Sequence, residues 1–185
     1  MTTGTTTRRP FGGLSPGARR RALWVLGFAQ LSLGVPLLLA ERAMKRTGGP
    51  GIIPFELAGT PEHAERITRT WGTVGQAAAR RSLMLDYPYL LVYATLQAIA
   101  CNAASDAMGR RRREMLAAAG PPLAWGQLIA GGFDAIENTA LLAILAGRDG
   151  RLPAVARACA TAKFALVTAG AGYVMLGLAS NVQRR

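Results

Sequence analysis

Three carboxylates and one lysine interrupt the long apolar stretches of this chain, where ionisable residues are rare. Asp134, Glu137 and Asn138 stand at positions i, i+3 and i+4, so a helix projects all three from one face. Asp86 and Lys163 lie in two other apolar stretches. Even on a mild insertion scale, four such groups at mid-bilayer oppose insertion by about 10 kcal/mol before pairing. This cost predicts that the groups face inward and share one site.

A second set of polar side chains continues inward from Asp86 at helical spacing: Tyr89, Tyr93 and Gln97. Depth can be counted from the membrane face that carries residues 41–80. Asp86 lies roughly 6 Å below this face and Lys163 roughly 14 Å below it, at 1.5 Å per helical residue. Asp134 falls near the middle of its stretch. Glu137 and Asn138 lie one turn nearer the reference face. We therefore expect Asp86, Asp134, Glu137, Asn138 and Lys163 in the same half of the membrane.

The simplest interpretation is structural. Lys163 pairs with Asp134 or Glu137, while Asn138 and the tyrosines satisfy the remaining polar groups and the cluster only fixes the helix register. One lysine, however, does not neutralise three acids. Protons or a bound cation must balance the remaining charge, so we expect at least one carboxyl to be protonated at neutral pH.

A neutral carboxylic acid in an apolar pocket can protonate an alkene or an epoxide, and a neighbouring carboxylate can then remove a proton. This chemistry suits cyclisation or double-bond isomerisation of an isoprenoid or another lipid. The candidate residues are Asp134 or Asp86 as the acid, Glu137 as the base, Tyr89 and Tyr93 as cation-stabilising walls, and Asn138 as an orienting donor. Gln97 and Lys163 are further candidates for substrate binding. We expect the pocket to open toward residues 41–80.

Two other functions use the same residues differently. In a proton- or cation-linked transporter or channel subunit, Asp86, Asp134 and Glu137 act as relay sites, and so short a chain then requires a homo-oligomer. A lipid-binding or structural membrane protein needs no catalysis. Metal-dependent diphosphate chemistry is disfavoured because intramembrane prenyltransferases need two acidic motifs. A single histidine and two cysteines, His63, Cys101 and Cys159, favour neither zinc nor haem, so we expect no cofactor and no metal.

The elements that must position these residues are four apolar spans at about 22–40, 82–103, 123–146 and 154–178. Half of the residues are hydrophobic, at 50%, and the charges lie almost entirely outside these blocks. The sequence therefore predicts an all-α integral membrane four-helix bundle over residues 19–180, preceded by a disordered basic tail over residues 1–18.

An amphipathic helix is also predicted between the first two spans. Thr60 can cap it, with Pro61 at its first position. Its apolar residues fall near one face: Ala64, Ile67, Trp71, Val74 and Ala78. This helix either lies in the membrane interface or packs on the end of the bundle.

The net charge of +12 comes largely from arginine clusters that flank the spans. Such clusters face lipid headgroups and set topology, so we expect membrane lipids and an apolar small molecule as partners, and no nucleic acid. The dense run at residues 110–113 favours cytoplasmic N- and C-termini in a multi-pass protein of the bacterial inner membrane.

Four stretches of the sequence resemble a group of small, uncharacterised four-span bacterial membrane proteins: residues 55–60, Trp71, residues 82–87 and residues 133–138. The resemblance covers residues 50–180 and implies no assigned activity.

The arrangement is also similar to the EXPERA superfamily of sterol isomerases and sigma-2-like receptors, which has four spans, a long first connection and an acid early in the second span. This similarity implies a protonating or ligand-binding role for Asp86. The chain departs from that pattern in having Gln30 in the first span and in placing Asp134 and Glu137 in the third.

Overall fold

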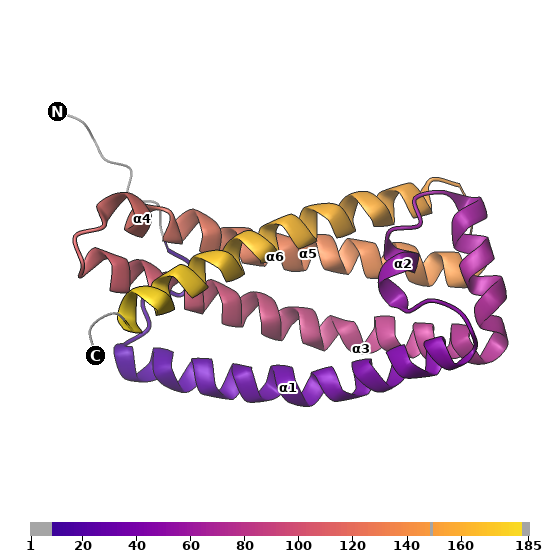
Figure 1. The fold of residues 1–185 in the computed structure, drawn as a ribbon, viewed down its shortest axis with the longest axis horizontal. Coiled ribbons are helices and arrows are strands. Elements are labelled where there is room, and N and C mark those ends of the chain that lie inside the picture. Colours follow the sequence, from indigo (N-terminus) through magenta and orange to yellow (C-terminus); the bar gives the residue numbers. More distant parts are fainter. Residues whose placement is uncertain (1–8, 149, 183–185) are drawn as a thin grey trace.

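The computed structural model describes residues 9–148 and 150–182, and helices dominate this part of the chain. Four long helices form the bundle: α1 (Pro16–Arg46), α3 (Pro61–Gly109), α5 (Gly120–Leu145) and α6 (Leu152–Val182). Two short helices, α2 (Ile52–Glu56) and α4 (Glu114–Ala118), lie in the connections (Figure 1). The described residues contain no strand, which confirms the predicted all-α four-helix bundle.

All four long helices are long and apolar enough to cross a membrane, as predicted. Helices α1, α3 and α6 extend beyond their predicted spans at both ends, whereas α5 begins three residues before its span and ends one residue before the span does. The polar and arginine-rich flanks remain helical, since arginine is a good helix former. Pro36 lies inside α1 and does not end it.

Helix α3 contains both the predicted amphipathic helix and the second span. The Thr60 hydroxyl accepts a hydrogen bond from the backbone N–H of His63 at 3.3 Å, which confirms the predicted cap. Gly72 then interrupts the helix with φ 57° and ψ −165°, a conformation that favours glycine. The turns before Gly72 lie across the end of the bundle (Figure 1).

The Gly72 kink also corrects one residue of the predicted apolar face. Ala64, Ile67 and Trp71 are buried as expected, but Val74 is 69% exposed. The helical phase restarts after the kink, so the spacing that aligned Val74 with Trp71 in the sequence does not hold in three dimensions. Ala79 instead continues the buried face.

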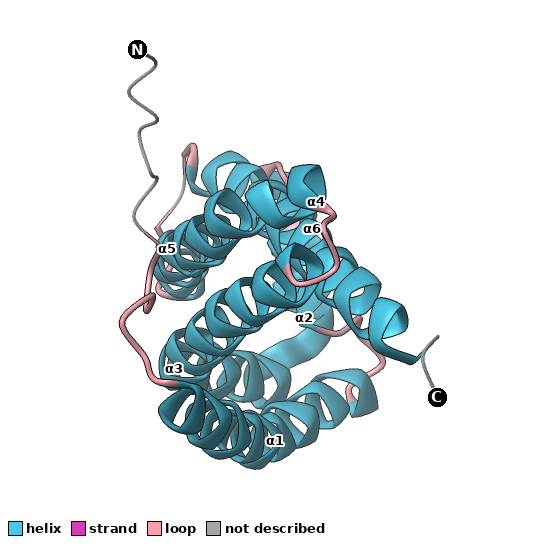
Figure 2. Cartoon of the chain, turned by 90° about the vertical axis from the view of Figure 1, so that its left-hand side faces the viewer, coloured by secondary structure: helices cyan, strands magenta, loops and turns pink. Residues whose placement is uncertain are grey.

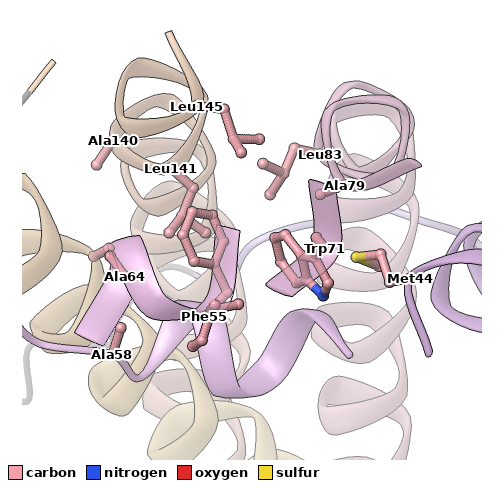
Figure 3. Packing of buried hydrophobic residues seen from close by; sticks show 12 residues of the cluster. Met44, Phe55, Ala58, Ala64, Trp71, Ala79, Leu83, Ala140, Leu141 and Leu145 are labelled. Atoms are coloured by element: carbon pink, nitrogen blue, oxygen red, sulfur yellow. The ribbon is translucent and has the colours of Figure 1, made fainter. Parts of the chain in front are cut away.

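The core at this end of the bundle joins α1, α2, α3, α5 and α6 around two aromatic rings (Figure 3). The rings of Phe55 and Trp71 meet edge to face, with their centroids 5.1 Å apart. Met44 from α1, and Leu83 and Leu141 from α3 and α5, are fully or almost fully buried around them. This core fixes α2 against the bundle and thereby positions Glu56, its last residue.

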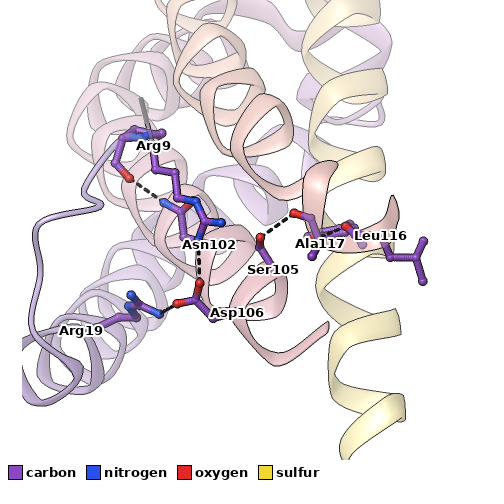
Figure 4. Close-up of polar contacts among 9 residues, drawn as sticks. Arg9, Arg19, Asn102, Ser105, Asp106, Leu116 and Ala117 are labelled. Carbon is purple, nitrogen blue, oxygen red and sulfur yellow. Dashed lines mark hydrogen bonds and ion pairs between the residues drawn. The ribbon is translucent and has the colours of Figure 1, made fainter. Parts of the chain in front are cut away.

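Polar contacts fasten the opposite end (Figure 4). The guanidinium groups of Arg9 and Arg19 donate to the two oxygens of Asp106 at 2.6 and 2.5 Å. The side-chain amide of Asn102 donates to the carbonyl oxygen of Pro10 at 2.5 Å. These contacts hold the segment that precedes α1 against the end of α3.

The predicted tail over residues 1–18 lies partly within the described part of the chain. Residues 1–8 lie outside it, whereas residues 16–18 belong to α1. The Ser15 hydroxyl caps α1 by accepting from the backbone N–H of Ala18 at 3.2 Å.

Helix α3 is central and packs on α1, α5 and α6, and α5 packs on α6 (Figure 2). Helix α1 packs on α3 and makes no comparable contact with α5 or α6. Large apolar side chains of α1 are correspondingly exposed, among them Trp24 at 77%, Phe28 at 74% and Leu31 at 75%. Among the described residues, helix α1 is thus joined to the bundle mainly through α3.

Candidate functional site

A cluster of buried carboxylates surrounds Lys163, which extends from α6 into the bundle. The Lys163 Nζ lies 2.9 Å from Asp134 Oδ1, 2.9 Å from Glu137 Oε2 and 3.7 Å from Glu56 Oε2. All four side chains are at most 10% exposed. The sequence proposed Asp134 or Glu137 as the partner of Lys163, and the structure brings both to it.

The face of α5 predicted from the spacing of Asp134, Glu137 and Asn138 points into the bundle, with exposures of 3%, 0% and 1%. Asp134 Oδ2 accepts a hydrogen bond from the Tyr93 hydroxyl at 2.9 Å, while its other oxygen accepts from Lys163. Both oxygens of this carboxylate are therefore satisfied.

Glu137 is bound less completely. Neither of its carboxyl oxygens has a hydrogen-bond partner among the described residues, so its contact with Lys163 is an ion pair without hydrogen-bond geometry. It is also the most deeply buried acid of the cluster. Glu137 is therefore placed to hold the Lys163 ammonium group, and its full burial leaves it no surface on which to bind a ligand.

Asp86 differs from these acids in its partner. Its Oδ2 accepts a hydrogen bond from the Asn138 side-chain amide at 2.7 Å, and the described ion pairs of Lys163 do not include it. Asp86 is half-buried on α3. The Asn138 amide is neutral and donates to a carboxyl oxygen, which accepts whether or not the other oxygen carries a proton. Asn138 therefore orients Asp86 equally well in its charged and protonated forms.

Glu56 is the member of the cluster that sequence reasoning did not assign. It is 7% exposed and enters from α2, outside the four spans. Burial raises the pKa of Glu56 above its ordinary 4.5, more than the nearby Lys163 ammonium lowers it. The one signal in the sequence is that Glu56 is the only acid in the otherwise apolar run of residues 52–58. Part of this run, residues 55–60, resembles the small four-span proteins, but that resemblance implies no chemical role for Glu56.

Three contacts hold α2 in place. The indole N–H of Trp71 donates to the carbonyl oxygen of Pro50 at 2.6 Å. The Glu41 carboxylate on α1 accepts from the backbone N–H of Ile52 at 2.9 Å. Gly51 packs so closely on this carboxylate that a side chain there would displace it. Glu56 is therefore presented by a short helix that is tied to both α1 and α3.

Two cavities adjoin the cluster. The first, of about 230 Å³, is lined by polar residues of the cluster and by Gln30, Gln97, Tyr89 and Tyr93. Its apolar wall is formed by Ile53, Phe164 and Val167. The second, of about 360 Å³, lies toward α2 and the end of α1. Glu56, Asp86 and Tyr89 line both cavities.

The predicted site residues differ in which of the two cavities they line. Asp86, Asp134, Tyr89, Tyr93, Gln97 and Lys163 line the first cavity and Asn138 lines the second. Glu137 lines neither, so the residue assigned as the base lies behind the cluster rather than at the cavity surface. Glu56, although buried, lines both cavities. Ile52, Ile53 and Glu56, all within the 41–80 connection, form part of the lining of the second cavity.

Gln30 extends from α1 into the first cavity. Its amide nitrogen donates weakly to the Tyr89 hydroxyl at 3.4 Å, and its buried amide oxygen has no partner among the described side chains and backbone groups. The Tyr89 and Tyr93 rings lie side by side on the α3 wall, with their centroids 5.9 Å apart. An occupant of the cavity would meet aromatic faces and hydrogen-bond acceptors.

The described residues define a helical bundle of the membrane-spanning type, with an acidic cluster beside a cavity. No group of three histidine, cysteine, aspartate or glutamate side chains in residues 9–148 and 150–182 is arranged to hold a metal ion. No protein-family model, curated protein or solved structure matches the chain.

Proposed function

We propose that the protein is a membrane-embedded acid–base enzyme that isomerises or cyclises an apolar lipid, of isoprenoid type, by proton transfer. The observation that carries this proposal is that two carboxyl groups with different partners, Asp86 and Glu56, line the same two cavities. Pairs of titratable groups in different environments are the usual arrangement for an acid and a base.

Asp86 is the acid in this proposal. Asn138 donates to its Oδ2, which leaves Oδ1 to carry the proton. The proton passes to one carbon of an alkene, and the π electrons form the new C–H bond, so the adjacent carbon becomes a carbocation. The faces of Tyr89 and Tyr93 stabilise this cation from the cavity wall.

Glu56 is the base. Its carboxylate removes a proton from a neighbouring carbon, and the electrons of that C–H bond form the product double bond. Glu56 then gives its proton to water and Asp86 takes up a proton from water, so both carboxyls are restored and no co-reactant is consumed. Asp134, Glu137 and Lys163 position these groups by fixing α5 and α6 around them.

An apolar substrate needs a route from the bilayer. The first cavity extends from Gln30 on α1 to Phe164 and Val167 on α6. Helix α1 makes no extensive contact with α6 among the described residues, so a lipid can enter between these two helices. The apolar side chains of Phe164 and Val167 line the cavity on the α6 side.

A transporter or channel subunit is the second candidate, and the excess of carboxylates over Lys163 favours it, since such acids can relay protons. A relay also needs a path to the other membrane face. At that end a core of Ala98, Cys101, Met108, Ala124 and Tyr173 occupies the bundle. Proton flux into proteoliposomes that is unchanged after neutralising Asp86, Asp134 and Glu137 would exclude transport through this cluster.

The enzyme proposal is tested by comparing lipid extracts of cells that lack the gene, or carry it as wild type or as Asp86→Asn. We expect a lipid to accumulate without the gene and with Asp86→Asn, and its isomer to return with the wild type. Glu114→Gln, at an exposed carboxylate in the distant α3–α5 connection, is the control and should behave as wild type. Full product formation by a correctly inserted Asp86→Asn protein would leave a lipid-binding or structural role.

A further inference from the structure

A groove of about 730 Å³ runs along the outside of the bundle between α5 and α6. It shares no lining residue with the two cavities of the carboxylate cluster. Small residues one helical turn apart form its floor on α5, at Ala135, Thr139 and Ala143. Ile136 and Val155 form its walls and are 52% and 40% exposed.

The floor of the groove is apolar in character. The only hydroxyl in it, that of Thr139, donates to the carbonyl oxygen of Ala135 at 2.7 Å and lies 2.8 Å from the Tyr87 hydroxyl. It is therefore already engaged. From Ala135 to Ala143 the floor is about 12 Å long, at 1.5 Å per residue, which suits a segment of an acyl chain.

The groove ends in two exposed arginines, Arg148 and Arg151, which flank the turn between α5 and α6. Within the part of the chain that the structure describes, neither takes part in an ion pair and no aspartate or glutamate lines the groove. Asp149, between them in sequence, lies outside the described part of the chain. Guanidinium groups bind phosphate oxygens in a forked geometry that lysine cannot reproduce.

The start of α6 adds to this positive charge. Leu152, its first residue, lines the groove beside Arg151. The free backbone N–H groups and the dipole of a helix N-terminus favour an anion at the same end. The charge therefore lies where the two spans end, at the level of the lipid headgroups.

We propose that this groove binds an anionic glycerophospholipid of the surrounding bilayer, with its phosphate on Arg148 and Arg151 and one acyl chain along the floor from Ala143 to Ala135. The lipid fills the surface between α5 and α6, which carry Asp134, Glu137 and Lys163 on their inner sides. The proposal does not depend on the activity of the carboxylate cluster.

The test uses the full chain purified in a neutral detergent. Phosphatidylglycerol or phosphatidylcholine is added, and lipid binding is followed by native mass spectrometry and by the thermal unfolding midpoint. We expect phosphatidylglycerol to bind the wild type and raise its midpoint more than phosphatidylcholine does. Arg148→Gln/Arg151→Gln should weaken phosphatidylglycerol binding by about tenfold or more, since each basic residue contributes on the order of 1 kcal/mol toward an anionic lipid.

Two controls separate a site from general charge attraction. Arg66→Gln/Arg81→Gln removes two exposed arginines that do not line the groove and should bind phosphatidylglycerol as the wild type does. Ala143→Leu fills the floor without a change of charge and should also weaken binding. Equal losses in the two arginine pairs would overturn the proposal. So would unaltered binding by Ala143→Leu, or displacement of the lipid by equimolar inorganic phosphate, because each means that the acyl chain contributes nothing.

Discussion

At the scale of single residues, Lys163 is the most constrained side chain of the described cluster. Its ammonium group lies within 3.7 Å of Asp134, Glu137 and Glu56, and it also lies 4.8 Å from the centroid of the Phe164 ring. A lysine held by three carboxylates is poorly placed to act as a nucleophile, because its charge is what keeps the acids together. Its role in the site is therefore positional.

Replacement of Lys163 tests this role. Lys163→Met should lower the free energy of unfolding by about 3–5 kcal/mol, since it leaves buried carboxylates without their counter-ion. Adding Glu137→Gln should recover part of the loss, because one unpaired charge is removed. Thermal unfolding in detergent measures both. Arg69→Gln, which breaks the exposed Glu65–Arg69 pair, is the control and should cost less than about 1 kcal/mol. A Lys163→Met protein as stable as this control would show that the pairs do not hold the bundle.

The raised pKa of Glu56 predicts a pH dependence of stability. Its carboxyl binds a proton more tightly in the folded than in the unfolded protein, so its contribution is fully present below pH 4.5 and is lost as the pH rises through the folded pKa. Glu56→Gln removes this contribution. The thermal midpoint of wild type should therefore fall more steeply than that of Glu56→Gln from pH 4.5 to neutral pH. Parallel curves would mean that Glu56 titrates normally.

The spacing of residues in the sequence predicted the inward face of α5, but it did not predict that Glu56 of α2 joins the cluster. The spacing of Asp134, Glu137 and Asn138 was sufficient because a regular helix carries all three. Glu56 lies in a five-residue helix, where no periodicity links it to the spans. The position of Glu137 behind the cavities could not be predicted for a related reason: spacing gives the face of a helix, but it does not distinguish a residue that lines a cavity from one behind it.

At the scale of the elements, α2 joins the connection between α1 and α3 to the site. Its five residues are too few to form a stable helix alone, so tertiary contacts must hold it. The contact from Trp71 is the most informative, because the indole combines a hydrogen bond to Pro50 with an edge-to-face contact to Phe55. The position of Glu56 therefore depends on a residue of α3 that immediately precedes the Gly72 kink.

Trp71→Phe separates these two contacts. It keeps an aromatic ring beside Phe55 but removes the hydrogen bond to Pro50, and it should lower the free energy of unfolding by about 1–3 kcal/mol through the unsatisfied carbonyl and the smaller ring. Turnover of the lipid substrate should fall as well, because α2 carries Glu56. Trp24→Phe, at a side chain that is 77% exposed, is the matched control. A Trp71→Phe protein that is less stable but has unchanged turnover would show that the position of α2 does not affect the reaction.

Sequence periodicity predicted the elements themselves more reliably than their junctions. Hydropathy located the four spans, and the Thr60 cap located the start of α3. The kink at Gly72 was not foreseen, because a glycine inside a helical pattern does not reveal its backbone angles. Burial of the face beyond it depends on those angles, which is why Val74 points outward.

At the scale of the whole molecule, the two ends of the bundle are closed in different ways. A hydrophobic core with Phe55 and Trp71 closes the end that carries α2, and ion pairs of Arg9 and Arg19 with Asp106 fasten the other. The cavities lie beside the first of these ends, next to α1. Neither the packing of α1 on α3 alone among the long helices nor the cavities could be predicted from hydropathy, which gives the spans but not their neighbours.

The proposed function requires that Asp86 transfers a proton to a carbon atom of a lipid in the cavity. The most direct measurement incubates purified protein in D₂O with the lipid extract of cells that lack the gene and follows deuterium in the product by mass spectrometry. Wild type should place a single solvent deuterium on a carbon of the product, and Asp86→Asn should form no labelled product. Product that forms without deuterium, or equal labelling by a folded Asp86→Asn protein, would contradict the claim.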